Sequence, residues 1–390
     1  MYSITTFSEL MKGLPRGAFD KLVRKHNADK YCKKFRHWDH LVSMTYAQLS
    51  GASGLKHLSE TFNAQAAHHY HLGTREIARS TVADANERRS SAVFSETVTW
   101  LMSQVSNSFC KDREELKYLL DSTSITLKGR EFERWTADNK TRNTQGIKLH
   151  VLLDSRSSSP AWIEFSAANV YDVELVDAVP LQQGALYVFD KGYCDYNWWQ
   201  RIDDAGGRFV TRFKKNAALI TLEERDVPLA VRDSVLHDRI VQFKRKFPGG
   251  SRVNRYTQPL RYLTVVRPDK ATPLILATND FESSAAEIAR CYKDRWEVEL
   301  FFKWIKQHLK IKKFYGRTEN AVRLQILTAL ISYLLVALYK QRHAIAGTLW
   351  QCLATITAQL FQRPATEREL ERRRRQKAQE LNSVQPCLFQ

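Results

Sequence analysis

Four polar side chains interrupt an apolar stretch in the last third of the chain. Residues 291–310 read CYKDRWEVELFFKWIKQHLK, and the interruptions are Tyr292, Arg295, Glu299 and Lys306. At about 100° per residue, these four fall within about a 60° wedge of a helix. Lys303 and Lys310 lie on or beside that wedge. We therefore predict a helix that is packed on most of its sides and directs one narrow polar stripe into a cleft.

A carboxylate between two cations has two interpretations here. Arg295 and Glu299 form an i,i+4 pair, and such pairs are commonly salt bridges on a helix surface. Alternatively, Glu299 belongs to a metal and phosphate site. Cutting or joining a phosphodiester uses divalent cations, and hard cations such as Mg²⁺ take oxygen ligands, usually carboxylates from separate elements. The second interpretation therefore requires partner carboxylates elsewhere.

Two aspartates have positions that suit such partners. Asp121 follows the apolar run 118–120, where an unpaired charge would be costly. Asp190 ends the run 186–189 and precedes Gly192; a carboxylate at the end of a strand is a common active-site placement in α/β sheets. Taken singly, each is also compatible with a turn or cap residue. Their order along the chain, strand, strand and then the helix of Glu299, favours a shared site.

The segments that would position these carboxylates have the pattern of strands. Short runs rich in β-branched and aromatic residues, separated by polar or proline-containing turns, cover 116–127, 146–154, 161–167, 185–193 and 208–213. Helical spacing over 197–207 joins the last two runs. Three strands followed by strand, helix and strand predict a mixed α/β sheet.

The chain divides into six predicted segments. They are a small helical N-terminal domain (1–70), a helical DNA-binding segment (71–113), the first part of an α/β core (114–213), a β-rich insertion (214–280), the helices that complete the core (281–345) and a helical tail (346–390). Within the second segment we expect two helices that meet near Ser80 and Thr81. This pair is either a helix-turn-helix reader of DNA or an ordinary helical pair, and the sequence leaves both open.

Composition bears on the partners of the chain. Sixty Lys and Arg residues against 42 Asp and Glu give a formal charge of +18, which attracts polyanions, of which nucleic acid is the commonest large one. A basic enzyme without such a partner is the alternative.

Six scattered cysteines without a CxxC pair suit a reducing cytoplasm. The apolar run 324–339 is shorter than a bilayer span, so we predict a buried helix and no membrane partner. The histidines at 68, 69 and 71 lack the accompanying ligands of a zinc site.

These motifs resemble the DDE transposases of bacterial insertion sequences. The spacing Tyr-x2-Arg-x3-Glu-x6-Lys that begins at Tyr292 is similar to the YREK signature of the IS-four family. Asp121 in LLDST and Asp190 in VFDKGY resemble the first two carboxylates of that family. STVADAN (80–86), GIKLHVLLD (146–154) and the continuation after Lys306 add to the likeness, which covers nearly the whole chain.

The resemblance implies a fold and a chemistry. The fold is a ribonuclease-H-like mixed sheet flanked by helices, with a β-rich insertion and a helical N-terminal DNA-binding region. Asp121, Asp190 and Glu299 would hold two Mg²⁺ or Mn²⁺ ions, and the cationic and phenolic side chains Tyr292, Arg295, Lys306, Lys303 and Lys310 would bind DNA. The partners implied are double-stranded DNA, as transposon ends and target, and a second copy of the chain in a synaptic dimer. Such a protein is expected at the nucleoid, in the bacterial cytoplasm.

Two questions stay open at the level of sequence. A ribonuclease-H-like nuclease without strand transfer and a DNA-binding regulator without catalysis are alternative functions. Relatives that form hairpin ends use an aromatic residue of the insertion, often Trp, to hold a flipped base, but this chain has no Trp between Trp199 and Trp296. Tyr256, Tyr262 and Phe243 are candidate substitutes, since stacking requires only a π face.

Overall fold

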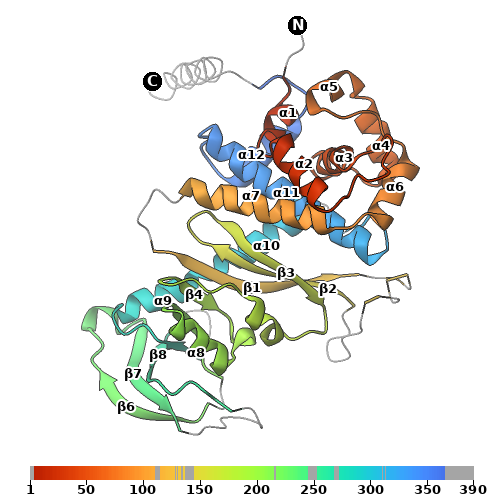
Figure 1. Cartoon of the computed structure of the whole chain (residues 1–390). Helices are drawn as coiled ribbons and strands as arrows, with labels where there is room; N and C mark the ends of the chain where they lie inside the picture. Colours follow the sequence, from red (N-terminus) through yellow and green to blue (C-terminus); the bar gives the residue numbers. More distant parts are fainter. Residues whose placement is uncertain are drawn as a thin grey trace, which may run out of the picture.

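The computed structural model has a layer of helices above one large mixed sheet (Figure 1). It describes residues 4–109, 115–127, 129, 131–132, 135–136, 145–214, 217–244, 253–267, 272–309, 311 and 313–364. Within these residues the strands form a nine-stranded sheet in the order β3-β2-β1-β4-β5-β9-β8-β7-β6. The strands are β1 Lys117–Thr126, β2 Gly146–Asp154, β3 Ser159–Ala167, β4 Leu186–Phe189, β5 Arg208–Arg212, β6 Leu219–Arg225, β7 Val235–Phe243, β8 Leu260–Val265 and β9 Leu274–Thr278.

The first five strands form the mixed half of the sheet. β1, β2 and β3 are antiparallel neighbours, while β4 runs parallel to β1 and β5 runs parallel to β4. Helix α8 (Tyr196–Asp204) makes the crossover from β4 to β5, and the Asp195 carboxylate caps its N-terminus. The predicted α/β class and the order of strands before 213 are confirmed.

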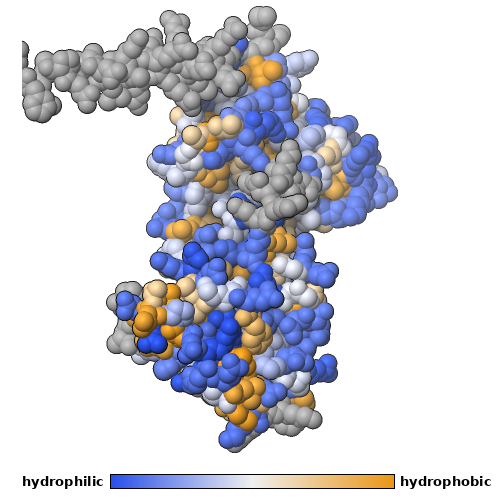
Figure 2. All heavy atoms as spheres, turned by 90° about the vertical axis from the view of Figure 1, so that its left-hand side faces the viewer, coloured by the Kyte–Doolittle hydropathy of each residue, from blue (hydrophilic) through white to orange (hydrophobic). Residues whose placement is uncertain are grey.

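Strands β6 to β9 extend the same sheet. They pair antiparallel with one another, and β9 pairs with β5, so residues 219–278 continue the edge of the mixed half (Figure 1). The domain boundaries themselves stay predictions. The exposed large hydrophobic side chains include Ile220 and Leu222 of β6. On the face drawn in Figure 2 the hydrophobic groups are small and separated by hydrophilic surface.

Helices cover the sheet on both faces. Alternating residues of β1 point to opposite faces: Leu119 lies in the larger core under the helical layer, and Leu120 lies in a second core around α8. The helices of the upper layer are α1 Thr6–Met11, α2 Arg16–Lys25, α3 His37–Ser50, α4 Leu55–Asn63, α5 His69–Leu72, α6 Arg79–Arg88, α7 Ala92–Phe109, α11 Glu319–Arg342 and α12 Leu349–Ala358. Helices α9 Ala285–Asp294 and α10 Trp296–His308 pack directly against strands of the sheet: α9 contacts β4, β5 and β7, and α10 contacts β1.

Helix α11 contains the apolar run 324–339. By length and composition it is the one helix among the described residues that is able to cross a membrane, but 83% of its most apolar window is buried inside the protein. It packs against α7, α3, α6 and α12. The run therefore has the environment of the buried core helix that we expected.

The predicted break between the two helices of residues 74–105 is wrong in position. Ser80 and Thr81 lie in the first turn of α6, where both are exposed, and the break falls at residues 89–91 instead. Hydroxyl side chains are tolerated in a first turn, because its amide groups have no partner within the helix. Of the predicted C-terminal tail, residues 365–390 lie outside the described residues.

Candidate active site

Strand register brings Asp121 and Asp190 side by side. The last pairs between β1 and β4 are Leu119 with Val188 and Leu120 with Phe189, so the two aspartates are the next residues on neighbouring parallel strands. Since side chains alternate, Asp121 points to the same face as Leu119, and a strand-like Asp190 points to that face as well. This is the face covered by α9 and α10.

Helix α10 brings Glu299 to the same face. Val298, Phe301, Phe302 and Ile305 anchor it by burial, and it packs across β1. Arg295 stands between α9 and α10 with helical backbone angles, so the two helices are nearly continuous.

The prediction that this helix is packed on most of its sides is wrong for one face. Trp296 is 57% exposed and Leu300 is 47% exposed. Neighbouring elements bury one side of α10, and both residues lie on the other side, which the apolar pattern alone does not reveal.

The Arg295 guanidinium joins two of the carboxylates. Its Nη1 donates to Asp121 Oδ2 at 2.6 Å and its Nη2 donates to Glu299 Oε1 at 2.6 Å. The Arg295 side chain is 17% exposed. The i,i+4 pair therefore exists, but it is a half-buried bridge between a strand and a helix rather than a pair on the surface.

The third carboxylate has its own cation. Arg212 Nη2 lies 2.8 Å from Asp190 Oδ1, and the Tyr292 hydroxyl donates to the same oxygen at 3.4 Å. Our sequence reasoning missed Arg212. Its position at the end of β5 is visible in the sequence pattern and was the one indication that Arg212 could belong to the site. In the structure, the pair Val188–Val210 puts Arg212 level with Asp190 on the neighbouring parallel strand.

Burial dominates the electrostatics of the site. It raises the pKa of Asp121 to about 6, although Arg295 and the backbone N–H of Ser122 act in the opposite direction. Burial also raises the pKa of Tyr292 to about 12, so at neutral pH its hydroxyl remains a hydrogen-bond donor. For Arg295, burial lowers the pKa, but Asp121, Tyr292 and Glu299 outweigh it and the pKa is raised.

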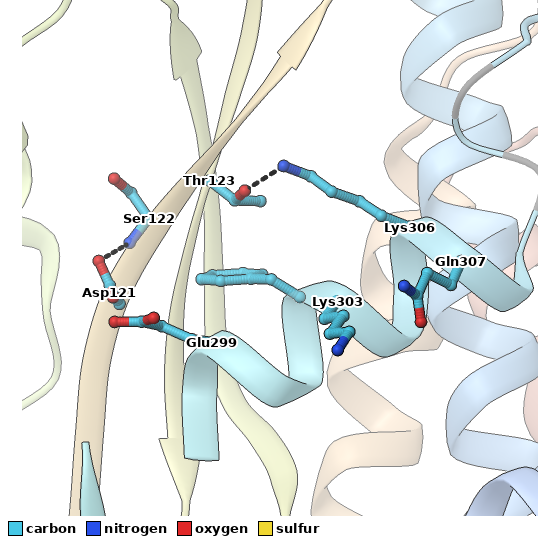
Figure 3. Close-up of a pocket in the computed structure, with 8 residues that line it drawn as sticks. Asp121, Ser122, Thr123, Glu299, Lys303, Lys306 and Gln307 are labelled. Atoms are coloured by element: carbon cyan, nitrogen blue, oxygen red, sulfur yellow. Dashed lines mark hydrogen bonds between the residues drawn. The ribbon is translucent and has the colours of Figure 1, made fainter. Parts of the chain in front are cut away.

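A cleft of about 490 Å³ opens beside these groups, between β1 and α10 (Figure 3). Lys306 lies across it: its Nζ donates to Thr123 Oγ1 at 2.5 Å and to the Ser124 carbonyl at 3.0 Å. The lining residues are Asp121, Ser122, Thr123, Glu299, Phe302, Lys303, Lys306 and Gln307. Lys310, which was expected to join them, lies outside the described residues.

A polar network supports the strand that carries Asp121. Ser122 Oγ donates to Asp172 Oδ1 at 2.8 Å, and Lys148 Nζ donates to the same oxygen at 3.0 Å. His150 contacts the Tyr193 hydroxyl at 3.0 Å, and burial lowers the pKa of His150 to about 4, so this imidazole is neutral. The network was not predicted, because its members come from distant segments. Ser122 and His150 pair across β1 and β2, whereas Asp172 and Tyr193 lie in short 3-10 segments after β3 and β4.

The donor set has the chemistry of a divalent-cation site, although the oxygen atoms of the three carboxylates do not all lie within 4.8 Å of one another in this arrangement. Asp121, Asp190 and Glu299 offer hard oxygen atoms on one face, and two guanidinium groups already bind those oxygens, so the place attracts positive charge. Among the described residues, the three histidines at 68, 69 and 71 are not part of any group close enough to share a metal ion.

The aromatic residues considered for a flipped base are used in packing. Tyr256 is 2% exposed. Tyr262 stacks on Phe213 with ring centroids 5.6 Å apart, and Phe243 lies 4.4 Å from the ring centroid of Tyr196. These rings belong to the second core or pack against it, where they join the β-rich strands to α8.

Comparisons with known proteins identify a matching family and several relatives. Residues 112–335 match the family described as "Transposase DDE domain", and residues 2–75 match "Domain of unknown function (DUF4372)". The y4zB protein of Sinorhizobium fredii, which carries a transposase name, is 38% identical over 284 residues, or 72% of this chain and 77% of that protein. A protein named as a transposase of insertion sequence element IS5377 from Geobacillus stearothermophilus is 31% identical over 57% of this chain and 56% of its own length.

Among solved structures, the piggyBac transposase synaptic complex with hairpin DNA is similar with a TM-score of 0.46 and 12% identity. The similarity covers 94% of this chain and 83% of that one.

Proposed function

Since the chain belongs to the DDE transposase family, whose members cleave DNA and transfer its strands, we propose that Asp121, Asp190 and Glu299 form its catalytic site. The observation that carries the proposal is the convergence of the three carboxylates from two parallel strands and one helix, with Arg295 joining Asp121 to Glu299. The spacing that starts at Tyr292 further supports membership of the IS-four subgroup with its YREK signature.

The three carboxylates would hold divalent metal. Members of the family depend on divalent ions, and we propose two Mg²⁺ or Mn²⁺ ions here. When bound, such ions activate the attacking oxygen and stabilise the leaving oxygen of an in-line displacement. The chain's own contribution is to orient the three carboxylates: strand register fixes two of them, and the buried side of α10 fixes the third.

The cations beside the carboxylates would bind the DNA. Arg295 and Arg212 are able to exchange a carboxylate for a phosphate oxygen, because a guanidinium binds either group with charge-assisted hydrogen bonds. Lys306 and Lys303 line the open side of the cleft, where the strand next to the scissile bond would pass. Tyr292 remains a donor at neutral pH, and we keep Lys310 as a further phosphate contact.

The substrate would be the inverted ends of an insertion sequence, with water and then the DNA 3′-hydroxyl as attacking groups. Two copies of the chain would hold the two ends in a synaptic dimer. The formal charge of +18 supports DNA as the partner. We propose that the protein acts at the nucleoid of a bacterial cell.

The proposal is tested with the full chain, Mg²⁺ and a duplex that carries the element's end and its flank. We expect a nick at the element boundary that requires Mg²⁺, followed by joining of the 3′ end to a target plasmid. Cleavage without joining would favour a ribonuclease-H-like nuclease, which the same site is able to support. Binding without cleavage would contradict the assignment of the catalytic site.

Replacing Arg295 or Lys306 by alanine is expected to slow cleavage by about a hundredfold each, the typical effect of removing one donor that stabilises developing charge. Cleavage rates at saturating DNA measure the effect, and thermal unfolding checks the fold. For Lys306→Ala we expect wild-type stability, since the lysine bonds to one hydroxyl and one carbonyl near the surface. Arg295→Lys should restore little of the cleavage rate, because a single ammonium group does not reproduce the guanidinium that donates to two carboxylates at once. If Arg295→Ala unfolds globally, the bridge from Asp121 through Arg295 to Glu299 is structural instead.

A further inference from the structure

A second concentration of positive charge lies far along the chain from the catalytic residues. We call residues 26–36, which join α2 to α3, the basic loop. It exposes Lys30, Lys33, Lys34 and Arg36, and the last turns of α2 add Lys21 and Arg24. Within the described part of the chain, no carboxylate lies within ion-pair distance of these six cations. Such a cluster repels itself unless a polyanion neutralises it.

The basic loop is firmly anchored despite its exposure. Asp29 Oδ1 accepts hydrogen bonds from the backbone N–H of His37 at 2.9 Å and from His37 Nδ1 at 2.7 Å. Arg89 donates to the Phe35 carbonyl and holds its guanidinium 4.9 Å from the centre of the Phe35 ring. The Arg89 carbonyl in turn accepts from Asn320 at 2.6 Å, at the start of α11. The loop is therefore fixed to the helix that follows the catalytic helix.

Asp29, Cys32 and His37 also lie close enough together to share a metal ion. However, the Arg89 guanidinium lies 3.8 Å from Cys32 Sγ and already supplies positive charge there. Hydrogen bonds and this guanidinium therefore account for the anchor without an ion.

Tyr31 is the most exposed part of the loop. Its side chain is 89% exposed, and its backbone has a φ of 67°, a left-handed conformation that residues other than glycine rarely adopt. The Lys30 ammonium lies 5.2 Å from the centre of its ring. Packing does not explain an aromatic residue held in this conformation with its ring in solvent. Such strain is typical of residues that are positioned for binding.

We propose that the basic loop binds the sugar-phosphate backbone of duplex DNA, as a contact separate from the catalytic cleft. Lys30, Lys33 and Lys34 bind phosphates, while the Tyr31 ring lies on a deoxyribose and its hydroxyl donates to a phosphate oxygen. This inference rests on the proposed function, because it takes transposon DNA as the partner. A backbone contact of this kind adds affinity regardless of base sequence and is sensitive to salt.

The test measures the affinity of the full chain for a labelled duplex by fluorescence anisotropy over a series of KCl concentrations. One duplex carries the inverted end and a second carries a scrambled sequence. In the combined Lys30→Gln, Lys33→Gln and Lys34→Gln variant, the slope of log affinity against log salt should become shallower by about 2.7, or about 0.9 per lost phosphate contact. Affinity should fall at least about tenfold, equally on both duplexes.

Two further variants examine Tyr31 and the specificity of the charge effect. Tyr31→Ala should weaken binding by about tenfold, and Tyr31→Phe should weaken it less, because only the hydroxyl contact is lost. Lys56→Gln serves as the matched control, since this exposed lysine of α4 pairs with Glu60, and it should leave the slope unchanged. Thermal unfolding of each variant should match the wild type, because the altered side chains are exposed.

The outcomes separate the two proposals. If the wild type does not bind either duplex, the proposed DNA-binding function fails and the inference fails with it. If the wild type binds but the triple lysine variant and Tyr31→Ala keep its affinity and salt slope, the inference alone is overturned. Retained nicking by the triple variant at low salt and saturating protein would support a contact distinct from the catalytic cleft.

Discussion

Replacing Asp121 by asparagine is expected to reduce Mg²⁺-dependent cleavage by at least about a thousandfold while leaving the protein equally or more stable. The catalytic loss follows from removing a charged metal ligand at the point where β1, β4 and α10 meet. The stability result follows from burial, which raises the pKa of this carboxyl to about 6 from an ordinary 3.8. A carboxylate that stays charged although it is buried lowers the stability of the fold, and active sites commonly carry such a cost.

The raised pKa of Asp121 makes the stability of the folded protein depend on pH. Because the folded protein binds the Asp121 proton more tightly than the unfolded chain does, this group makes the folded state less stable as the pH rises from about 3.8 through about 6. Above pH 6 the cost is of the order of 2–3 kcal/mol. In EDTA at pH 7.5, Asp121→Asn should therefore have a higher Tm than the wild type. The difference in Tm should be smaller at pH 5.

The matched variants sharpen this test. Asp190→Asn and Glu299→Gln should abolish cleavage to the same extent, since each removes one of the three converging carboxylates. Asp177→Asn should cleave normally, because Asp177 is exposed and pairs only with Arg201 among the described residues. Cleavage retained by Asp121→Asn would remove it from the catalytic site, whereas a large loss of stability at pH 7.5 would assign it a structural role.

The sequence predicted the parts of this site that depend on local pattern. Strand boundaries before residue 213 follow from runs of β-forming residues, and Asp121 and Asp190 stand out because each ends or interrupts an apolar strand. What it did not predict depends on contacts between distant segments. Arg212 joins Asp190 only because β4 and β5 are parallel and in register, and Lys148 of β2 reaches Asp172 in the 3-10 segment that follows β3. Likewise, Trp296 and Leu300 look like core residues in a helical pattern, but none of the described elements covers that side of α10 sufficiently to bury them.

Replacing Arg261 by methionine is expected to lower the free energy of unfolding by about 3–5 kcal/mol, the usual cost of leaving one partner of a buried ion pair uncompensated. Among the described residues, Arg261 is the largest charged side chain that is fully buried: it is 2% exposed, and its partner Asp238 is 3% exposed. Nε and Nη2 donate to the two oxygens of Asp238 at 2.9 and 2.6 Å, which joins β8 to β7. Nη1 donates to the carbonyls of Asp280 and Ser283, at 3.2 and 2.5 Å, immediately before α9 begins.

Because α9 carries Tyr292 and leads into α10, the effect of Arg261 should extend to the active site. Urea unfolding at pH 7.5 measures the loss of stability, and the cleavage rate below the unfolding transition measures any displacement of α9. The double variant Arg261→Met, Asp238→Leu should recover much of the lost stability, since it removes the uncompensated charge together with its partner. It should not recover the cleavage rate if the carbonyl contacts to Asp280 and Ser283 are what hold α9 in place. A single variant with wild-type stability would mean that Asp238 finds water or another cation, and that the β-rich strands are joined to the catalytic helix by their backbone pairing alone.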